Sequence, residues 1–469
     1  MTTTTATLQS VLDRIDADFD GALDRLCRLL RIPSISTDPE YATHIRQAAE
    51  SLAVDLKSIG FDASVRDTTG HPLVVAHHPG PPGEKVPHIL YYGHYDVQPP
   101  DPLEEWDSGP FDPAIVPSEH GRKIVARGAV DDKGQLMTFI EAFRAWHDVH
   151  GTMPIRITVM LEGEEESGSP SLDAFLQANR DELRADACIV CDTGMWQVDV
   201  PAITYMLRGL VYIEATLHGP GMDLHSGGYG GAVVNPINAI TRVLAQLHDD
   251  RGVVQIPGFY DDVRELSDAE AAQWKALGFD ERAFLASAGL KTPTGEAGRS
   301  TLERIWSRPT CDINGIRGGY IGDGAKTVIG NRATAKISCR LVADQDPKQV
   351  QTALVRFLED RRPPDCRWTF HYHGCNPAIR VPTDSPYLAA ASRGLATVFE
   401  RPPVLIGSGG SIPVVGSIQK ILGFDSLLVG FGLDDDRIHS PNEKFEVACY
   451  QNGIRSHAAI MDELSRLSV

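Results

Sequence analysis

The stretch Leu161-Glu162-Gly163-Glu164-Glu165-Glu166-Ser167-Gly168-Ser169 decides how the rest of the chain is interpreted. It ends an apolar run, residues 155–161, that is typical of a buried strand, so a block of carboxylates enters a turn rich in Gly and Ser. Like charges crowded at a strand end repel one another and need compensation. In water they could simply be hydrated, whereas beside a metal one glutamate could be a ligand while its neighbour moves a proton. The block alone leaves both interpretations open.

The composition sets the class of protein. A chain of 469 residues is long enough for two domains, and its 42% hydrophobic and 23% charged content is ordinary for a globular protein. Its net charge of -19 argues against nucleic acid or anionic membranes as partners. We also expect no secretory signal and no membrane span, because no basic n-region and no apolar stretch of sufficient length is present.

The eight cysteines are scattered along the chain and predict a reducing compartment. The segment Cys188-Ile189-Val190-Cys191 has the spacing of a redox or zinc motif, but it lies inside an apolar strand and no second pair accompanies it. We interpret these two residues as buried thiols and expect a cytoplasmic protein.

Helical and strand-like patterns alternate at both ends of the chain. Solid apolar runs between helical patterns indicate an α/β domain with a mostly parallel sheet covered on both faces. The predicted helices span residues 11–30, 41–59, 134–146 and 387–399, and the predicted strands span residues 73–76, 88–92, 123–126, 155–161, 187–190 and 426–431.

The middle of the chain has a different pattern of apolar and polar residues. Residues 211–218 and 327–342 alternate like half-buried strands, residues 235–247 and 349–358 are helical, and residues 249–308 are polar and irregular. This pattern predicts an inserted α+β domain with one open sheet face. We therefore expect a catalytic domain in two parts, residues 1–207 and 383–469, interrupted by an inserted domain of residues 208–382.

Five predicted strand ends each carry a group that could bind a metal. Alternation along an extended segment places His94 and Asp96 on one side, so Asp96 could hold the imidazole of His94. Open parallel sheets gather such groups at the carboxyl ends of their strands. Imidazoles and carboxylates suit zinc, manganese or cobalt, and there are enough for two ions. The five positions are His94, the turn Arg127–Gly134, the Glu164–Glu166 block, Asp192 and His439.

These segments, with others, resemble the M20 metallopeptidases, which include carnosinase-like and Cys-Gly dipeptidases, acetylornithine deacetylase and succinyl-diaminopimelate desuccinylase. The resemblance covers nearly the whole chain, and the later motifs are similar to the dipeptidase branch. The segments that carry it are residues 92–99, 127–134, 161–169, Asp192, Asp223-Leu224-His225-Ser226-Gly227, residues 324–329, Gly409-Gly410-Ser411-Ile412-Pro413 and His439-Ser440-Pro441-Asn442-Glu443-Lys444.

The resemblance implies a role for each matching residue. Asp131 would bridge two divalent metals, with His94 and Asp192 holding one and Glu166 and His439 holding the other. Zinc is the first expectation, with manganese or cobalt as alternatives. The family usually has a cis peptide after the bridging aspartate, here between Asp131 and Asp132.

The same resemblance implies the catalytic groups. Glu165 would be the general base that takes a proton from the attacking water and returns it to the leaving amine, and Asp96 would orient His94. His225 would donate a hydrogen bond to the oxyanion from the other subunit of a homodimer, so the inserted domain would be both lid and dimer interface.

Three further residues would bind a small peptide substrate. Arg340 would hold its C-terminal carboxylate, with Thr327 and Ser411 nearby, and a bidentate contact would favour a free C-terminus. Carnosinase-like members usually have Arg-Glu where this chain has Gly407-Ser408, which leaves the fine substrate preference open. Asp192 favours dipeptides, because desuccinylase- and carboxypeptidase-type members tend to carry Glu there.

The sequence therefore predicts a cytoplasmic, homodimeric, two-metal hydrolase of dipeptides or short peptides. Three alternatives remain open at this point: an N-acyl-amino-acid amidohydrolase of the same family, a catalytically silent metal-binding homologue, and a structural metal site.

Overall fold

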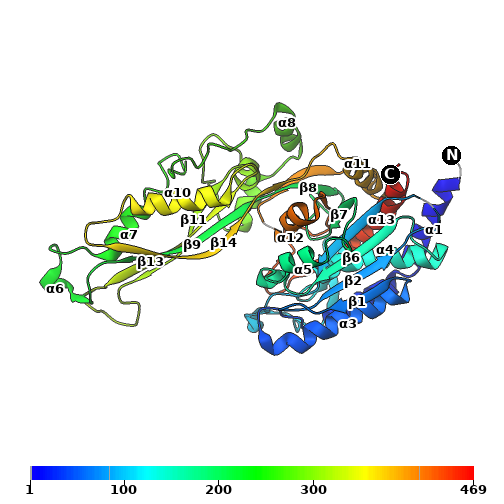
Figure 1. Ribbon diagram of the computed structural model, residues 1–469, viewed down its shortest axis with the longest axis horizontal. Helices are drawn as coiled ribbons and strands as arrows, with labels where there is room; N and C mark the ends of the chain where they lie inside the picture. The colour runs from blue at the N-terminus through cyan, green and yellow to red at the C-terminus, as the bar shows by residue number, and fades with distance from the viewer. Residues whose placement is uncertain (1–2, 84, 411, 469) are drawn as a thin grey trace. The chain divides into compact units, whose positions relative to one another are not determined.

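The computed structural model describes residues 3–83, 85–410 and 412–468 (Figure 1). Internal contacts divide the chain into two compact units. The first unit contains Met1–Tyr205, Val381–Ile406 and Pro413–Val469, and the second contains Met206–Arg380 and Gly407–Ile412. No helix among the described residues is both long enough and apolar enough to cross a lipid bilayer.

The first unit is built on a mixed sheet with strand order β1-β2-β6-β3-β7-β17-β8. At its centre, β6, β3, β7 and β17 are parallel, whereas β1, β2 and β8 are antiparallel to their neighbours. The predicted α/β class with a parallel central sheet is confirmed, and the antiparallel strands at both sides are an addition to it. The strands are β1 (Asp62–Arg66), β2 (Leu73–His78), β3 (His88–His94), β6 (Arg156–Glu162), β7 (Ala187–Val190), β8 (Ala202–Leu207), β16 (Val404–Ser408), which pairs with β8, and β17 (Ser426–Leu428).

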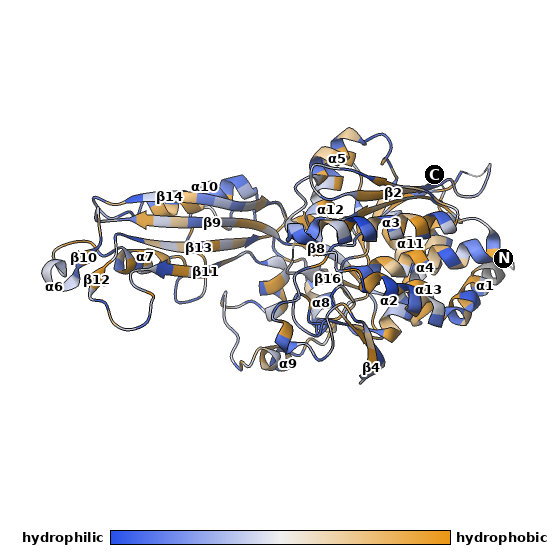
Figure 2. Ribbon diagram, turned by 90° about the horizontal axis from the view of Figure 1, so that it is seen from below, coloured by the Kyte–Doolittle hydropathy of each residue, from blue (hydrophilic) through white to orange (hydrophobic). Residues whose placement is uncertain are grey.

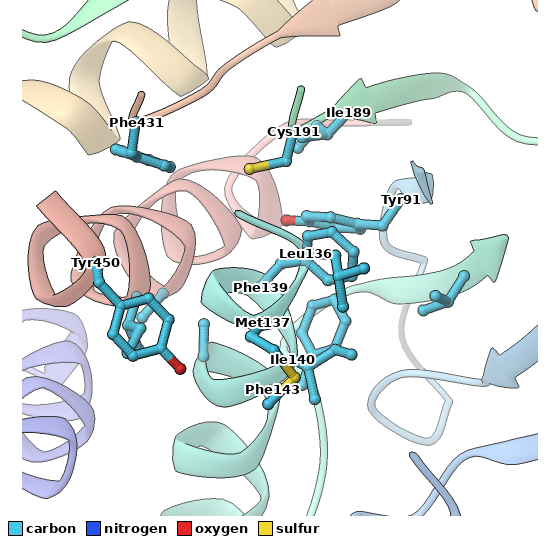
Figure 3. Packing of buried hydrophobic residues seen from close by; sticks show 14 of the residues in the cluster. Tyr91, Leu136, Met137, Phe139, Ile140, Phe143, Ile189, Cys191, Phe431 and Tyr450 are labelled. Atoms are coloured by element: carbon cyan, nitrogen blue, oxygen red, sulfur yellow. The ribbon is translucent and has the colours of Figure 1, made fainter. Parts of the chain in front are cut away.

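Helices cover this sheet and form most of the apolar core. Helix α4 packs closely on β3, since a Cβ atom at Gly93 would lie 2.9 Å from Cβ of Leu136. Figure 3 shows Phe139 and Phe143 of α4 beside Tyr91 of β3, with ring centroids 5.3 and 5.0 Å from that of Tyr91. The helices are α1 (Thr3–Ala17), α2 (Phe19–Leu30), α3 (Ala42–Ser58), α4 (Lys133–His150), α5 (Leu172–Ala178), α11 (Pro386–Phe399), α12 (Pro413–Ser417) and α13 (Val447–Ser465), with short turns η1 (Pro39–Tyr41), η2 (Leu103–Glu105), η3 (Glu165–Ser167) and η5 (Ile418–Leu422).

Two sequence predictions for this unit need correction. The single helix expected over residues 11–30 is broken at Asp18, whose carboxylate binds the guanidinium of Arg25 at 2.8 Å. The strand expected over residues 123–126 is β5 (Gly121–Val125), which does not join the main sheet. It lies between β4 (Ala114–Ser118) and β18 (Lys444–Glu446) in a small antiparallel sheet, so two segments far apart in sequence meet there.

The second unit has an antiparallel sheet with strand order β11-β13-β9-β14. Buried and partly exposed residues alternate along β9, as the sequence pattern predicts, and the ribbons of β9, β13 and β14 carry both hydropathy colours (Figure 2). The buried side chains form a separate core with those of α7 and α10. The elements are β9 (Gly209–His218), β10 (Leu224–His225), α6 (Ser226–Tyr229), α7 (Pro236–Leu244), β11 (Thr310–Gly318), β12 (Val328–Ile329), β13 (Arg332–Leu341), α10 (Pro347–Glu359), β14 (Arg367–Asn376) and β15 (Ile379–Arg380).

The polar stretch 249–308 contains three short helical segments. Ser267 caps α8 (Asp268–Ala276) and Asp280 caps α9 (Glu281–Ser287) through side-chain oxygens that accept backbone N–H groups. A third segment, η4 (Glu303–Ser307), carries Trp306, whose ring lies across that of Trp274 at 5.1 Å. Local caps, ring contacts and ion pairs of Arg299 and Arg308 with Glu265 and Glu296, rather than a long periodic pattern, hold this stretch together.

Candidate metal centre

The first unit brings the five predicted metal ligands together at the carboxyl ends of its parallel strands. His94 is the last residue of β3, Glu166 lies in η3 directly after β6, and Asp192 follows β7 by two residues. Asp131 lies just before α4, and His439 lies in the loop that follows β17. The donor atoms form two groups within 4.8 Å: His94, Asp131 and Asp192 make up one, and Asp131, Glu166 and His439 make up the other.

Asp131 is shared by both groups. Its Oδ1 atom lies 3.1 Å from Nε2 of His94, and its Oδ2 atom lies 3.0 Å from Nε2 of His439. His439 is also 3.3 Å from Oε2 of Glu166, and His94 is 3.9 Å from Oδ1 of Asp192. Each oxygen of Asp131 therefore faces a different imidazole, which is the arrangement that a carboxylate between two cations requires.

The donor set fits divalent cations. Nε2 of His94 and Oε1 of Glu166 are buried and make no hydrogen bond with any described residue. A buried polar atom without a hydrogen bond is costly, so Oε1 of Glu166 calls for a ligand that the protein itself does not supply, and Nε2 of His94 has only the nearby carboxylate of Asp131. The predicted Asp131–Asp132 cis peptide is also present.

The electrostatics of the centre favour added positive charge. Burial lowers the pKa of His94, but the carboxylates of Asp131 and Asp96 outweigh it and hold that pKa well above its ordinary value. Contacts with Asp131 and Glu166 raise the pKa of His439 to about 10. Both imidazoles thus retain protons strongly in the absence of metal, and a bound cation would replace that positive charge.

Asp96 connects the first group to the acidic turn. Its Oδ1 atom lies 3.4 Å from Nδ1 of His94, and its carbonyl oxygen lies 3.1 Å from the same nitrogen. Its carboxylate also accepts the backbone N–H groups of Glu165 at 3.2 Å and Glu166 at 3.0 Å. The predicted contact with His94 is present, and the structure adds that the same side chain fixes the turn carrying the two glutamates.

The three consecutive glutamates occupy different environments. Glu164 accepts backbone N–H groups from His71 at 3.1 Å and Ser171 at 2.9 Å, so its carboxylate closes a loop. Glu166 points to His439 and also accepts a hydrogen bond from Gln98 at 2.7 Å. Burial raises the pKa of Glu165 well above its ordinary value, with His94 opposing the shift.

The sequence analysis did not identify Glu443 as a site residue, although its buried carboxylate contacts the backbone of Asp131. Glu443 lies four residues after His439 and is fully buried. Oε1 accepts the N–H groups of Val130 and Asp131, and Oε2 accepts Gly128 N–H and Nη1 of Arg127 at 2.7 Å. Burial raises the pKa of Glu443 to about 7, while Arg127 and the backbone donors favour the ionised form. The only sequence signal was its place in the segment 439–444.

The loop that carries His439 has an unusual backbone. Arg437, His439 and Asn442 have φ angles of 58°, 63° and 61°, in the left-handed region that residues other than Gly adopt rarely. Asn442 fastens the loop, because its side chain accepts Asp107 N–H at 2.8 Å and donates to the carbonyl oxygen of Glu105 at 2.9 Å. Contacts outside the loop thus hold His439 in place.

The second unit contains the remaining predicted residues. His225 pairs with Val328 across β10 and β12, and the carbonyl oxygen of Thr327 accepts Ser226 N–H, so His225 and Thr327 are neighbours. The side chain of His225 accepts Gly227 N–H at Nδ1, which leaves Nε2 as the N–H donor of a neutral ring. Ser411 lies outside the described residues.

Arg340 is separated from that pair within one chain. It is near the end of β13 that pairs with the start of β9, whereas β10 and β12 lie towards the Arg332 end (Figure 2). The eight steps along the strand from Arg332 to Arg340 span roughly 26 Å. The expectation that Thr327 lies near Arg340 is therefore not met within a single chain.

Sequence and structure comparisons identify the family of the chain. Residues 90–463 match the sequence profile described as peptidase family M20/M25/M40. The chain is 30% identical to a Cys-Gly metallodipeptidase of Candida albicans over 468 residues, 96% of each chain. The crystal structure of human carnosine dipeptidase 1 superposes with a TM-score of 0.84 at 28% identity, covering 98% of this chain and 99% of that one. An M20 family metallo-carboxypeptidase from Sulfolobus solfataricus gives a TM-score of 0.82 at 31% identity, covering 95% and 99%.

Proposed function

The chain belongs to peptidase family M20/M25/M40, and on that premise we propose that it is a two-metal dipeptidase acting on dipeptides or short peptides with a free C-terminus. The predicted resemblance to the dipeptidase branch is confirmed, and the protein is a metallopeptidase. The relatives named as dipeptidases motivate the substrate class. The observation that carries the two-metal proposal is Asp131, whose two oxygens face two different imidazoles.

We assign the metal ligands as the sequence predicts. His94 and Asp192 would hold one ion, Glu166 and His439 the other, and Asp131 both, with zinc as the first expectation and manganese or cobalt as alternatives. When bound, divalent ions at these ligands would lower the pKa of a water molecule and polarise the peptide carbonyl.

Glu165 is the proposed proton carrier. It shares η3 with Glu166, and Asp96 fixes the backbone N–H groups of both residues. A base on so rigid a turn can take a proton from the attacking water and return it to the leaving amine. Asp96 would also keep the His94 ring oriented, through its contacts with Nδ1.

Two residues of the second unit are proposed to act on the substrate. The Nε2–H group of His225 would donate to the developing oxyanion, because Gly227 N–H occupies Nδ1. Arg340 would bind the C-terminal carboxylate. We also propose that Thr327 contacts the substrate beside His225. Ser411, which lies outside the described residues, is proposed to bind the substrate as well.

The separation of His225 from Arg340 supports a homodimer. A dipeptide is much shorter than the roughly 26 Å of strand that lies between Arg332 and Arg340, so the two residues cannot serve one substrate from one chain. We propose that His225 and Thr327 come from the partner chain. In this arrangement residues 208–382 form the lid and dimerisation domain, and residues 1–207 and 383–469 form the catalytic domain.

A cytoplasmic location also remains a proposal. All eight cysteines of the chain are free thiols and seven are buried, which is compatible with the reducing compartment that the sequence predicts.

A substrate panel tests the proposed function. Metal-reconstituted protein is given unblocked dipeptides, the same dipeptides with an amidated C-terminus, and N-acetyl or N-succinyl amino acids. We expect cleavage of the dipeptides with a free carboxylate. Cleavage of only the acylated amino acids would identify an amidohydrolase, and no cleavage with both metals bound would indicate the catalytically silent homologue.

A further inference from the structure

Glu443 is the best-connected buried carboxylate that the proposed mechanism does not use. Its two oxygens accept four donors, two on each oxygen: N–H of Val130 and Asp131 at 3.0 and 3.1 Å, and N–H of Gly128 and Nη1 of Arg127 at 3.0 and 2.7 Å. Both Glu443 and Arg127 are buried, at 0% and 1% exposure. So complete a set of charge-assisted hydrogen bonds leaves little freedom for either partner.

These contacts join two loops that both supply metal ligands. The donor side is the turn 127–131, which ends in the bridging residue Asp131. The acceptor side is the loop that carries His439, four residues before Glu443. The backbone adds a further tie, because Ala126 N–H donates to the carbonyl oxygen of Glu443 at 3.1 Å, just before β18 pairs with β5.

The turn 127–131 packs closely against the start of α4 and is also held by Glu443. Gly134, in the first turn of α4, approaches it so closely that a Cβ there would lie 1.8 Å from the carbonyl oxygen of Ala129. The backbone N–H groups of Gly128, Val130 and Asp131 donate to Glu443 in buried hydrogen bonds, so they would lose their acceptor without it. One side chain thus satisfies three backbone donors of the turn that presents the bridging carboxylate.

We propose that Glu443 is the positioning residue that sets the distance between Asp131 and His439, and thereby the affinity of the second metal position. The inference rests on the proposed two-metal site. Glu443 is not proposed to contact either the metal or the substrate. It would act through the backbone N–H group of Asp131, which it accepts, and through the three residues 440–442 that join it to His439. The group formed by Asp131, Glu166 and His439 therefore depends on Glu443 more than the group formed by His94, Asp131 and Asp192.

The Glu443→Gln variant tests this role. Glutamine keeps the length of the side chain and one carbonyl acceptor, but its NH2 group would face the donors of Gly128 or Arg127 instead of accepting from them. Loss of supporting contacts of this kind commonly lowers metal affinity about 10–100-fold. We expect that loss at one of the two binding steps, the one that fills the group of Asp131, Glu166 and His439, when zinc is titrated into the metal-free protein. We also expect an altered visible spectrum of the cobalt-substituted protein.

Glu141→Gln is the matched control. Glu141 is also buried, at 4% exposure, and accepts two hydrogen bonds from Arg25 at 2.7 Å and one from Arg144 at 3.2 Å, but it lies in the third turn of α4, away from the loops that carry the metal ligands. We expect it to lower the free energy of unfolding while leaving both zinc affinities and the cobalt spectrum unchanged. Glu443→Asp keeps the charge but shortens the side chain, and we expect it to bind zinc with an affinity between those of the wild type and Glu443→Gln.

The outcomes separate this inference from the proposed function. Two zinc affinities in Glu443→Gln equal to those of the wild type, with an unchanged cobalt spectrum, would overturn the positioning role. Failure of the wild type to bind two ions would instead contradict the proposed function.

Should Glu443→Gln not fold, hydrogen exchange on the wild type decides the question. The amides of Val130 and Asp131 should exchange slowly even in the metal-free protein, because Glu443 holds them without metal. Fast exchange of both amides there would contradict the inference.

Discussion

The metal centre of the first unit and the His225 segment of the second are held in different ways. His94 is fully buried between Asp131 and Asp96, and Asp131 is fixed through Glu443. His225 is exposed, and its side chain is held by one hydrogen bond from a neighbouring backbone group. The first region is completed by contacts within its own unit, whereas the second presents an oriented donor outward. The comparison indicates that the metal centre is assembled within one unit, and it is consistent with our proposal that His225 acts in a site formed with a partner chain.

Removing the base should have the largest effect on turnover. Glu165→Gln keeps the shape of η3 and the backbone contacts with Asp96, and we expect kcat to fall about 1,000-fold, since general bases contribute roughly 100- to 10,000-fold. Metal content should stay at the wild-type level.

The neighbouring Glu164 is the control for that prediction. Its carboxylate holds backbone groups of His71 and Ser171, so Glu164→Gln should lower the free energy of unfolding and leave kcat within about threefold of the wild type. Equal losses of kcat in the two variants would mean that the acidic block acts as one unit and not through Glu165.

Replacement of His225 should have the second largest effect on kcat. His225→Ala should lower kcat about 100- to 1,000-fold with little change in the free energy of unfolding, because the side chain is exposed and its loss removes one oxyanion donor. Urea unfolding and steady-state kinetics measure the two quantities.

Mixing inactive chains sharpens this test. Heterodimers of His225→Ala with Glu165→Gln should recover about half of the wild-type activity, since one of their two shared sites is intact. Proven heterodimers without activity would place His225 in the site of its own chain.

Arg340 should affect substrate binding more than chemistry. Arg340→Met removes a charged partner of the substrate carboxylate, and we expect KM for unblocked dipeptides to rise about 10- to 100-fold, equivalent to the roughly 1.5–3 kcal/mol of a hydrogen bond to a charged group. Any residual cleavage of C-terminally amidated dipeptides should be unaffected. An equal rise of KM for both substrates would mean that Arg340 does not recognise the carboxylate.

The free energy of unfolding should depend on pH through the buried His457 of the first unit, whereas an exposed histidine such as His120 should have no such effect. Burial lowers the pKa of His457 to about 3, so the folded state keeps this ring neutral while the unfolded chain protonates it below its ordinary pKa of 6.5. Its contribution to stability is present above pH 6.5 and is lost as the pH falls towards 3. Between pH 7 and pH 5 the metal-free protein should lose about 2 kcal/mol through this group.

His457→Phe removes that titration and measures it by difference. The variant's free energy of unfolding should fall about 2 kcal/mol less than that of the wild type over the same pH range. The exposed His120 gives the control, since His120→Phe should retain the wild-type dependence. The same dependence in all three proteins would show that His457 is not kept neutral in the folded state.

The parts that could be predicted from sequence are those whose signal is local. His94, Glu166 and Asp192 come within a few residues of the end of an apolar run, so the pattern placed them at strand ends. Parallel strands bring their carboxyl ends to one edge of the sheet. The same logic identified β3, β6 and β7. The alternation in β9 indicated a sheet with one buried face, because a period of two reports burial directly.

The remaining features depend on contacts between distant segments. Glu443 appears polar and unremarkable in sequence, and only the fold brings three backbone N–H groups from residues 128–131 to its carboxylate. The position of β5 beside β18 joins residues more than 300 apart. Helix α13 is buried nearly all round, so it lacks the one-sided apolar pattern by which helices at the surface are identified.

The stoichiometry of metal binding tests the central claim most directly. Metal-free protein is titrated with zinc and the bound ions are counted by elemental analysis, with His439→Ala measured alongside. Because Asp131 faces two donor groups, we predict two ions per wild-type chain and one ion per His439→Ala chain, the remaining ion being held by His94, Asp131 and Asp192. One ion per wild-type chain, unchanged in His439→Ala, would contradict the assignment of Asp131 as a bridge between two metals.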